Sequence, residues 1–330
     1  MIVDAHLDIA ANAMEGRNVL LPALEQTPDA QGIPTVGLPD LKAGGIGLIC
    51  GTIFTAHKTY MPRGYSSPEE ASVMGIRQAQ WYQQQELAGR MRIVRRAADL
   101  PAADDPGTAL HSIMLMENAD PILSPEQVEW WHLQGVRVVG MAWKQTRYAG
   151  GTGFPGGLTD EGKQLTKELD AFGIIHDVSH LAEEAFWELL KLSKGPIMAS
   201  HSNCRSIVPT DRQLSDEMIR AITNRGGVIG INFYDQFLLP PGAKRRATLA
   251  DVMSHVKHIC EIAGDTDHVG MGTDFDGGLG REEIPEEITT AADLHKVGIE
   301  AARNGFTPED QQKLMAGNWL KLFQKNLPSK

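Results

Sequence analysis

Cysteine is scarce in this chain, with only three in 330 residues. Cys50, Cys204 and Cys260 are odd in number and widely spaced, so they match neither a disulfide framework nor a zinc knuckle. We interpret them as reduced residues that pack in the interior. The sequence therefore favours neither a small disulfide-stapled fold nor a cysteine-bound metal.

Long apolar runs and an excess of positive charge are also missing. No apolar stretch approaches the roughly 18 to 20 residues that cross a bilayer, and nothing at the N-terminus resembles a signal peptide. We therefore expect a soluble, cytoplasmic protein. The formal charge of −11 disfavours nucleic acid and anionic membranes as partners. A small-molecule substrate remains the expected partner, and a homodimer is left open.

The chain does contain short apolar segments that alternate with helical patterns, from one end to the other. Helical periodicity is seen at 69–100, 125–134, 160–172, 181–193, 215–225 and 247–263, and residues 285–327 resemble closing helices. Continuous apolar strands between helices predict one (β/α)8 barrel domain over residues 1–330, with insertions after the first strands. A doubly wound sheet is the alternative. The eight expected strands are 2–7, 46–54, 112–116, 136–143, 174–178, 197–200, 228–233 and 269–272.

The first strand ends in an imidazole and a carboxylate. Ile2 and Val3 are apolar, and His6 and Asp8 follow two residues apart, so both side chains point to one side of an extended strand. Burying such a pair is costly unless a cation compensates, and zinc accepts both ligand types. A capping or hydrogen-bonded pair is the alternative for this motif alone.

The same pattern, in which a polar residue follows an apolar strand, recurs at later strand ends. In a parallel barrel these ends meet at one face, where the active site lies. Each residue alone could be a satisfied polar side chain in a loop, but their common placement predicts a metal-dependent enzyme. The residues are His6, Asp8, Glu117, His180, His201 and Asp274.

The remaining histidines are less informative. His255 and His258 lie near one helical face without the glutamate of a metalloprotease helix, so we interpret them as a solvated face. His176 shares strand parity with His180 but lies deeper, which predicts a place in the barrel interior or behind the ligands. The other five histidines fall in no metal-binding pattern.

Taken together, these segments resemble the membrane (renal) dipeptidase family of the amidohydrolase superfamily. The likeness is carried by Met-Ile-Val-Asp-Ala-His-Leu-Asp at the N-terminus, Asp-Val-Ser-His at His180, Ser-His-Ser-Asn at His201, Gly-Thr-Asp-Phe-Asp-Gly-Gly at Asp274, and Gly-Asn-Trp-Leu-Lys-Leu-Phe near the C-terminus. It covers almost the whole chain, in order. It implies a (β/α)8 barrel that holds two zinc ions.

The resemblance also implies a role for each site residue. His6 and Asp8 would hold one metal, His180 and His201 the other, and Glu117 would bridge them. A bridging carboxylate makes chemical sense, because its two oxygens can contact two cations about 3.5 to 4 Å apart. The counterpart of Asp274 is a proton shuttle that meets the substrate amine.

Arg212, Trp143 and Asn118 bear on the substrate. Arg212, eleven residues after His201, matches the family arginine that holds the substrate's terminal carboxylate, and a guanidinium fork suits that task. A surface position ahead of a helix is the alternative for Arg212. Trp143 occupies the place where mammalian members have a histidine at the scissile carbonyl, and Asn118-Ala119 replaces the usual Gly-Gly. These departures predict a pocket in which Trp143 affects substrate choice.

The predicted function is that of a dinuclear zinc dipeptidase that tolerates a D-residue on the carboxyl side. One alternative is a mononuclear amidohydrolase, such as a deaminase or cyclic amidase, that uses His6, His201 and Asp274 with one metal. Glu117 separates the two, because a mononuclear site needs no bridge. Another alternative is a catalytically silent barrel that binds metal or peptide.

Overall fold

The computed structural model describes residues 1–102 and 109–329. Within these ranges, the eight predicted barrel strands are all present and parallel, in the order β10-β11-β1-β2-β4-β5-β8-β9. Residue pairing between Ala199 and Ile229 joins the two ends of this order and closes the barrel. The strands are β1 (Ile2–Leu7), β2 (Ile46–Phe54), β4 (Leu110–Glu117), β5 (Val136–Gly140), β8 (Ile175–Asp177), β9 (Ile197–Met198), β10 (Ile229–Ile231) and β11 (Val269–Met271).

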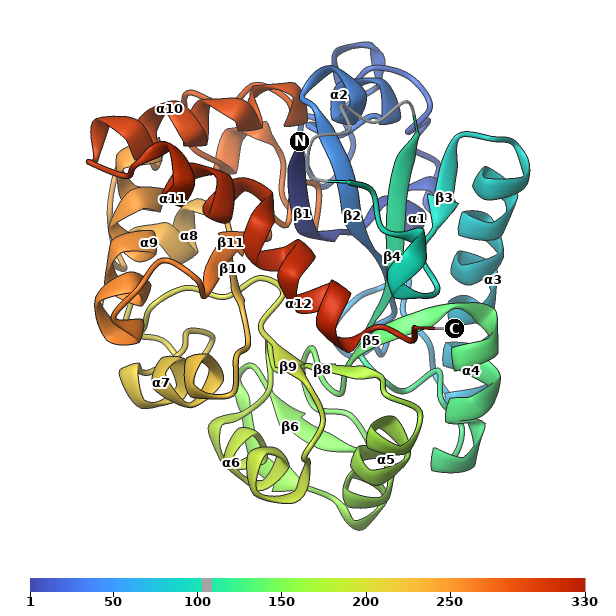
Figure 1. Cartoon of the computed structure of the whole chain (residues 1–330). Coiled ribbons are helices and arrows are strands. Elements are labelled where there is room, and N and C mark those ends of the chain that lie inside the picture. Colours follow the sequence, from blue (N-terminus) through green and yellow to red (C-terminus); the bar gives the residue numbers. More distant parts are fainter. Residues whose placement is uncertain (103–108, 330) are drawn as a thin grey trace.

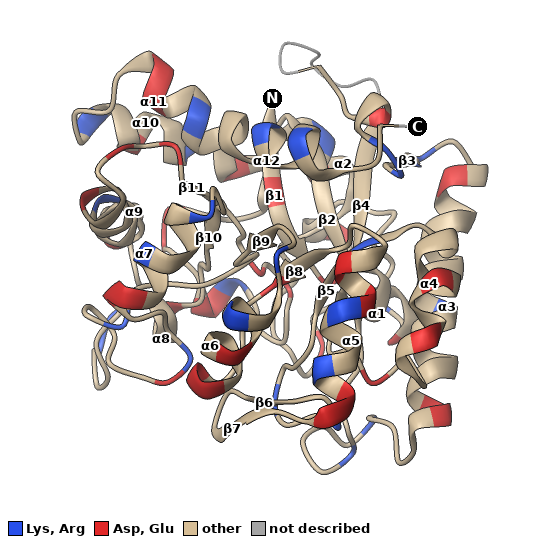
Figure 2. Cartoon of the chain, turned by 60° about the horizontal axis from the view of Figure 1, so that its bottom comes forward, with Lys and Arg blue, Asp and Glu red and all other residues tan. Residues whose placement is uncertain are grey.

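Helices form an outer layer around the strands (Figure 1). They bury apolar faces against the outside of the barrel, as in other (β/α)8 folds. Acidic residues recur along these helices with basic residues between them (Figure 2). The helices are α1 (Ile9–Met14), α2 (Leu38–Ala43), α3 (Pro68–Leu87), α4 (Val128–Gln134), α5 (Asp160–Ala171), α6 (Glu183–Leu192), α7 (Asp216–Asn224), α8 (Asp235–Leu238), α9 (Leu249–Ala263), α10 (Lys296–Arg303), α11 (Pro308–Gln312) and α12 (Asn318–Asn326).

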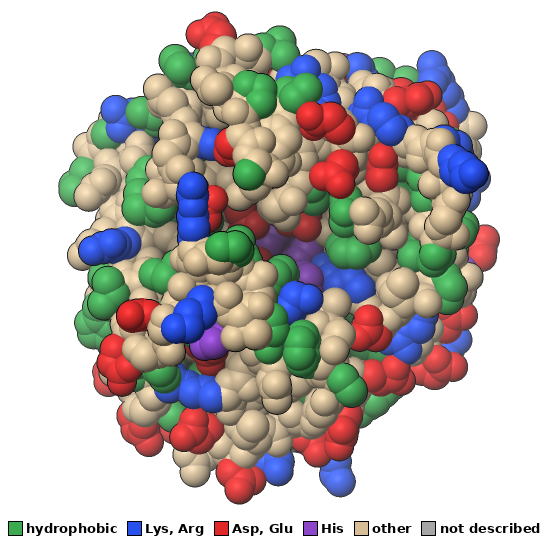
Figure 3. Space-filling view, turned by 180° about the vertical axis from the view of Figure 1, so that it is seen from behind, with side chains coloured by type: hydrophobic (Ala, Val, Ile, Leu, Met, Phe, Trp, Pro, Cys, Tyr) green, Lys and Arg blue, Asp and Glu red, His purple; other side chains and the backbone are tan. Residues whose placement is uncertain are grey.

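The barrel interior is apolar and α12 closes one end of it. Val3, Leu48 and Ile113 pack inside the strands together with Trp319 and Phe323 of α12. The Trp319 indole N–H donates to the carbonyl of Met271 at 2.9 Å. In Figure 1, α12 crosses in front of the strands at the end opposite to the hollow seen from behind in Figure 3. The hollow seen in Figure 3 therefore lies at the end of the barrel opposite to α12, with the packed core between them.

Two local predictions were wrong in extent, and three short strands were not predicted. The helix expected at 69–100 ends at Leu87, because Gly89 adopts φ +70 and turns the chain into β3 (Met91–Ile93), which pairs with β4. The strand expected at 136–143 ends at Gly140. After it, an unpredicted antiparallel hairpin forms from β6 (Ala149–Gly151) and β7 (Phe154–Leu158). The hairpin lies in glycine-rich sequence and β3 has only three residues, so neither shows a clear periodicity.

The loop after β1 is tied to the loop after β11. Arg17 donates to Asp29 at 2.6 and 2.8 Å, and its Nη1 lies 3.1 Å from the carboxylate of Asp276. Asp276 also accepts from the backbone N–H groups of Thr35 and Val36. This network fixes the rim beside Asp274. None of the helices in the described ranges is long and apolar enough to cross a membrane.

Candidate metal centre

The predicted strand-end residues gather around one cavity. It has a volume of about 320 Å³, and its lining includes Asp8, Glu117, His180, His201 and Asp274. Figure 3 looks into this hollow, with histidine side chains at its floor and acidic side chains beside them. His6 lies just beneath, fully buried and in contact with Glu117. The structure thus brings together all six residues that the sequence placed at strand ends.

The two carboxylate oxygens of Glu117 face different groups. Its Oε2 lies 3.2 Å from Nε2 of His6. Its Oε1 lies 3.3 Å from Nε2 of His180 and 3.5 Å from Nε2 of His201. The Nε2 atoms of His180 and His201 are themselves 3.0 Å apart. Because Glu117 ends β4, its side chain extends from the strand into the space between both groups.

Asp8 and Asp274 complete the group around His6. The Nε2 atom of His6 lies 4.0 Å from Oδ1 of Asp8 and 4.0 Å from Oδ1 of Asp274. The hydroxyl of Thr52 donates to Asp8, and the amide of Asn232 donates to the other oxygen of Asp274 at 2.9 Å. Both carboxylates are therefore held in place by neighbours from adjacent strands.

Burial and charge set the protonation of these groups. Burial alone would lower the pKa of His6, but Glu117 and the other carboxylates raise it to about 10. Burial lowers the pKa of His180 and of His201 well below the usual value, so both rings are neutral. Burial, with Asp8 and Glu117 nearby, raises the pKa of Asp274 to about 8. The cluster thus places several carboxyl groups in a desolvated space, where a cation would stabilise their ionised forms.

Backbone strain is concentrated at the same place. Among the described residues, four that are not glycine adopt a positive φ: Asn118 (73°), His180 (64°), Asp274 (62°) and Asp276 (61°). Three of them line the cavity, and Asn118 directly follows Glu117. Such conformations cost about 1 to 3 kcal/mol each and cluster at functional sites. At His180 and Asp274 this conformation accompanies a side chain that lines the cavity shortly after a strand.

Asn118 does not crowd Glu117. Its side-chain amide donates to the carbonyl of Thr55 at 2.7 Å, and its oxygen accepts from the backbone N–H of Asp120 at 3.1 Å. Asparagine is one of the few residues besides glycine that adopts the left-handed region readily. The Asn118-Ala119 departure therefore preserves the turn after β4 and directs the extra side chain away from the cavity.

Arg212 is buried rather than on the surface. Its guanidinium donates to the carbonyl of His201 at 2.6 Å and to the hydroxyl of Ser202 at 3.2 Å, and it stacks 5.2 Å from the ring centre of Phe237, a cavity residue. Its Nε is buried, and none of the described residues accepts a hydrogen bond from it. The surface alternative for Arg212 is excluded. A buried guanidinium with a spare donor is suited to an anionic group.

Trp143 lies on the cavity wall beyond the end of β5. Its ring packs edge-on against Phe54 at 5.4 Å and lies 6.3 Å from the ring of His180. Lys144 Nζ lies 5.2 Å from the Trp143 ring at the same rim. Trp143 is therefore placed to contact whatever enters the cavity.

Two interpretations of histidines were wrong. His176 faces outward to α5, where its Nε2 lies 2.7 Å from Asp170, and it is the next residue, Asp177, that points to the site. His255 is fully buried and not on a solvated face. Its Nδ1 accepts from the backbone N–H of Cys204 at 3.1 Å, and burial lowers its pKa to about 4. His258 is partly exposed, as expected.

Sequence reasoning missed Ser200 and Asp177. The Ser200 hydroxyl lies between His6 and His201, and Asp177 accepts its hydrogen bond. The available signal was their position at strand ends, Asp177 three residues before His180 and Ser200 next to His201. Serine did not stand out, because it is not among the usual zinc ligands.

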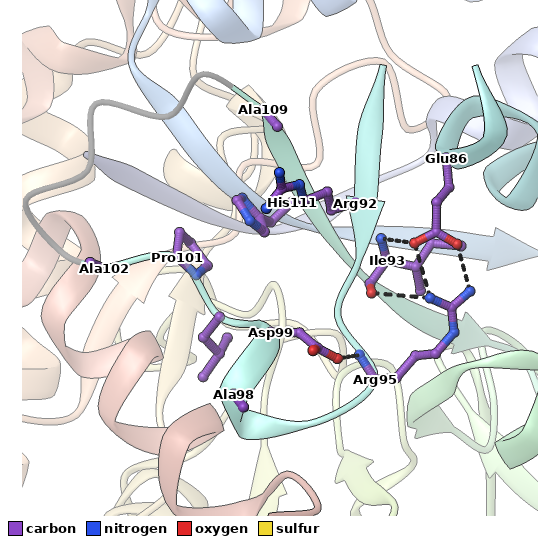
Figure 4. Close-up of a pocket in the computed structure, with 11 residues that line it drawn as sticks. Glu86, Arg92, Ile93, Arg95, Ala98, Asp99, Pro101, Ala102, Ala109 and His111 are labelled. Carbon is purple, nitrogen blue, oxygen red and sulfur yellow. Dashed lines mark hydrogen bonds and ion pairs between the residues drawn. The ribbon is translucent and has the colours of Figure 1, made fainter. Parts of the chain in front are cut away.

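A second cavity, of about 400 Å³, lies beside β3 and is shown in Figure 4. Its charged groups are largely paired with each other: Arg95 donates to both oxygens of Glu86 at 2.9 and 2.7 Å. Although this cavity is larger, the described residues that line it form no cluster of imidazoles and carboxylates like the one at the strand ends. The chemistry therefore belongs to the smaller cavity.

The donor atoms fit a metal such as zinc. Zinc bonds to nitrogen and oxygen at about 2.0 to 2.1 Å, so tetrahedral ligand atoms lie about 3.3 Å apart. The distances among His180, His201 and Oε1 of Glu117 are 3.0, 3.3 and 3.5 Å. The ligand atoms of His6, Asp8 and Glu117 form a second set within 4.8 Å of one another, as do those of His6, Asp177 and His201.

Residues 1–328 match the model of a protein family described as membrane dipeptidase, peptidase family M19. A Klebsiella pneumoniae protein from the pqqA 5′ region is 32% identical over 248 residues, which cover 72% of this chain and 89% of that protein. An uncharacterized dipeptidase of Schizosaccharomyces pombe is 32% identical over 169 residues, which cover 51% of this chain but only 40% of its own length.

Solved structures show the same likeness. The dipeptidase AC, a metallopeptidase of family M19, superposes with a TM-score of 0.86 at 27% identity, covering 100% of this chain and 99% of its own. A metallopeptidase from Rhodobacter sphaeroides, liganded with a phosphinate mimic of the dipeptide L-Ala-D-Ala, superposes with a TM-score of 0.85 at 26% identity, covering 99% of each chain.

Proposed function

Because this chain belongs to the membrane dipeptidase family and is a hydrolase of the metallo-dipeptidase type, we propose that it binds two zinc ions and hydrolyses the peptide bond of dipeptides. We further propose that it accepts a D-residue on the carboxyl side of that bond. The two ions would be held by His6 and Asp8 on one side and by His180 and His201 on the other, with Glu117 shared.

The observation that carries this proposal is the orientation of Glu117. Its Oε2 approaches His6 at 3.2 Å, and its Oε1 approaches His180 and His201 at 3.3 and 3.5 Å. A carboxylate that binds a single ion would not need different histidine nitrogens beside each of its two oxygens. This geometry favours a dinuclear centre over the mononuclear alternative with His6, His201 and Asp274.

When bound, the ions would lower the pKa of a water molecule and polarise the substrate carbonyl. The protein must still move protons. Peptide hydrolysis removes a proton from the attacking water and delivers one to the leaving amine, and one carboxylate can perform both steps. Asp274 suits this role, because it borders the centre at 4.0 Å from His6 and is oriented by Asn232.

Arg212 would hold the substrate's terminal carboxylate. The guanidinium is fixed by the carbonyl of His201 and the hydroxyl of Ser202 but keeps an unpaired Nε donor. A charge-assisted bond to a carboxylate would satisfy that donor. Binding the carboxyl end beside His201 would place the scissile bond near the metal centre.

Support for a D-residue comes from the Rhodobacter sphaeroides relative, whose ligand mimics L-Ala-D-Ala. Trp143 and Phe54 line the cavity here and are expected to set which side chains are preferred. The silent-barrel alternative is disfavoured, because each predicted ligand and the proton carrier are present in one cluster.

The test is turnover of a library of L-L and L-D dipeptides by zinc-loaded protein. We expect hydrolysis of some members of both sets. Activity on L-L dipeptides alone would refute the D-residue proposal. If no dipeptide is cleaved while zinc is bound, the silent barrel becomes the better account.

A further inference from the structure

Ser200 connects two histidines that belong to the two proposed zinc sites. Its hydroxyl oxygen lies 3.0 Å from Nδ1 of His6 and 2.7 Å from Nδ1 of His201. The same hydroxyl lies 2.5 Å from Oδ2 of Asp177. We propose that Ser200, held by Asp177, is a positioning residue that keeps a hydrogen on Nδ1 of both imidazoles, so that both Nε2 lone pairs are free for the two ions. This inference rests on the proposed function.

The position of each hydrogen follows from what a hydroxyl group can donate and accept. A serine hydroxyl has one hydrogen to donate and two lone pairs to accept with. If the hydrogen goes to Asp177, both imidazole contacts must be N–H donors to Ser200. If instead the hydrogen went to one imidazole, that ring would carry its hydrogen on Nε2.

Asp177 is the stronger acceptor for this hydrogen. The 2.5 Å contact is charge-assisted, whereas the hydroxyl of Ser179 lies 3.5 Å from Ser200. The carboxylate is itself fixed, because its Oδ1 accepts from the backbone N–H groups of Ser179 at 3.0 Å and Ser200 at 2.9 Å. Asp177 therefore has its second oxygen directed at the Ser200 hydroxyl.

Keeping the hydrogen on Nδ1 leaves the Nε2 atom, on the other side of each ring, without a hydrogen. Nε2 of His6 is directed to Oε2 of Glu117, and Nε2 of His201 is directed to Oε1. A hydrogen on either Nε2 would occupy the position that a cation needs. One hydroxyl thus orients a ligand of each ion, which would couple the two sites.

The backbone holds Ser200 tightly in place. Ser200 is fully buried. A Cβ atom at Gly230 or Gly272 would lie 2.0 or 1.8 Å from the Ser200 carbonyl oxygen, so only glycine fits at either position. These contacts involve the backbone of Ser200 and not its hydroxyl, so Ser200→Ala keeps them.

The experiment measures zinc affinity by competition with a chromophoric chelator. In Ser200→Ala we expect both zinc affinities to fall about 10- to 100-fold, the usual effect of removing a residue that orients a metal ligand. Asp177→Asn keeps the shape but directs an amide N–H at Ser200, which turns the hydroxyl hydrogen toward an imidazole, so affinity should fall in this variant too.

Two variants serve as comparisons. Ser112 on β4 is also fully buried, and its hydroxyl has no hydrogen-bond partner within residues 1–102 and 109–329, so Ser112→Ala should keep both affinities. The Thr152 hydroxyl contacts Nδ1 of His180 at 2.9 Å and serves one proposed site. Thr152→Ala should weaken one ion only. Thermal unfolding of each variant shows that the fold is retained.

The imidazole nitrogen signals of the zinc-loaded protein provide a second readout. Nδ1–H protons of His6 and His201 should be observed in the unaltered chain and exchange faster in Ser200→Ala. Zinc affinities within twofold of the unaltered chain in Ser200→Ala, or a loss at one ion only, would overturn the inference. Failure of the proposed function would be seen separately, as fewer than two zinc ions on the unaltered chain.

Discussion

The Nε2 atoms of His180 and His201 lie 3.0 Å apart, although the two residues follow different strands. Burial keeps both imidazoles neutral. Their separation is near the distance of about 3.3 Å between two ligands of one tetrahedral zinc ion. The barrel therefore presents this pair already arranged for a cation, with Oε1 of Glu117 as a third ligand atom.

Replacing Arg212 by lysine should raise KM more than it lowers kcat. Lysine keeps the charge but loses the fork that would bind the substrate carboxylate, so mainly uniform binding is lost. Steady-state kinetics on a good dipeptide provide the measurement. Arg205→Lys is the matched control, because Arg205 pairs with the partly exposed Glu183. Equal kinetics in both variants would place Arg212 outside the substrate site.

Trp143→His should change the ranking of dipeptide substrates while zinc content stays the same. Trp143 lines the cavity, and its ring lies 6.3 Å from the ring of His180, but it is not one of the predicted metal ligands. The measurement is kcat/KM over a dipeptide panel, with zinc analysis on the same preparation. Trp130→His, at a partly exposed position on α4, is the control. An unchanged ranking, or lost zinc, would contradict this role.

Asp274→Asn should lower kcat by about 10² to 10⁴-fold, because asparagine keeps the shape of the side chain but cannot carry a proton. Zinc content should be roughly preserved. If Asp274 is instead mainly a metal ligand, zinc would be depleted and added metal would restore much of the activity. A variant with near-normal turnover would defeat both accounts.

Asp170 should contribute to stability in a pH-dependent way. Burial alone would raise its pKa, but hydrogen bonds from His176 and Ser193 outweigh burial and lower it to about 2, from the ordinary 3.8. A lowered carboxyl pKa stabilises the fold above the unfolded value, and this contribution is lost as pH falls toward 2. Asp170→Asn should therefore cost about 1 to 2 kcal/mol at pH 7 and less at pH 3. Urea unfolding at both pH values tests this, and a constant difference would argue against it.

Much of the barrel could be predicted because its strands are continuous apolar runs, and its site because polar residues end those runs. Elements without such a pattern were not predictable. The three-residue strand β3 follows a helix that only the conformation of Gly89 ends. His255 was misinterpreted because helical periodicity does not report its bonds to Cys204 and Leu238, which are distant in sequence.

The residues that contact the predicted metal ligands from behind, Ser200 and Asp177, could not be predicted from the sequence either. Ser200 is an ordinary residue in the sequence, and its importance depends on the approach of His6, 194 positions away. The outward direction of His176 follows from the register of β8, where Asp177 rather than His176 faces the site. Such facts depend on how strands pair, which local pattern does not specify.

Elemental analysis of metal-replete protein tests most directly whether Glu117 joins two zinc ions. We expect about two zinc ions per chain in the unaltered protein. In Glu117→Ala, the loss of a ligand common to both sites should lower this number. One tightly bound zinc per chain, unchanged in Glu117→Ala, would contradict the dinuclear centre and favour a mononuclear amidohydrolase.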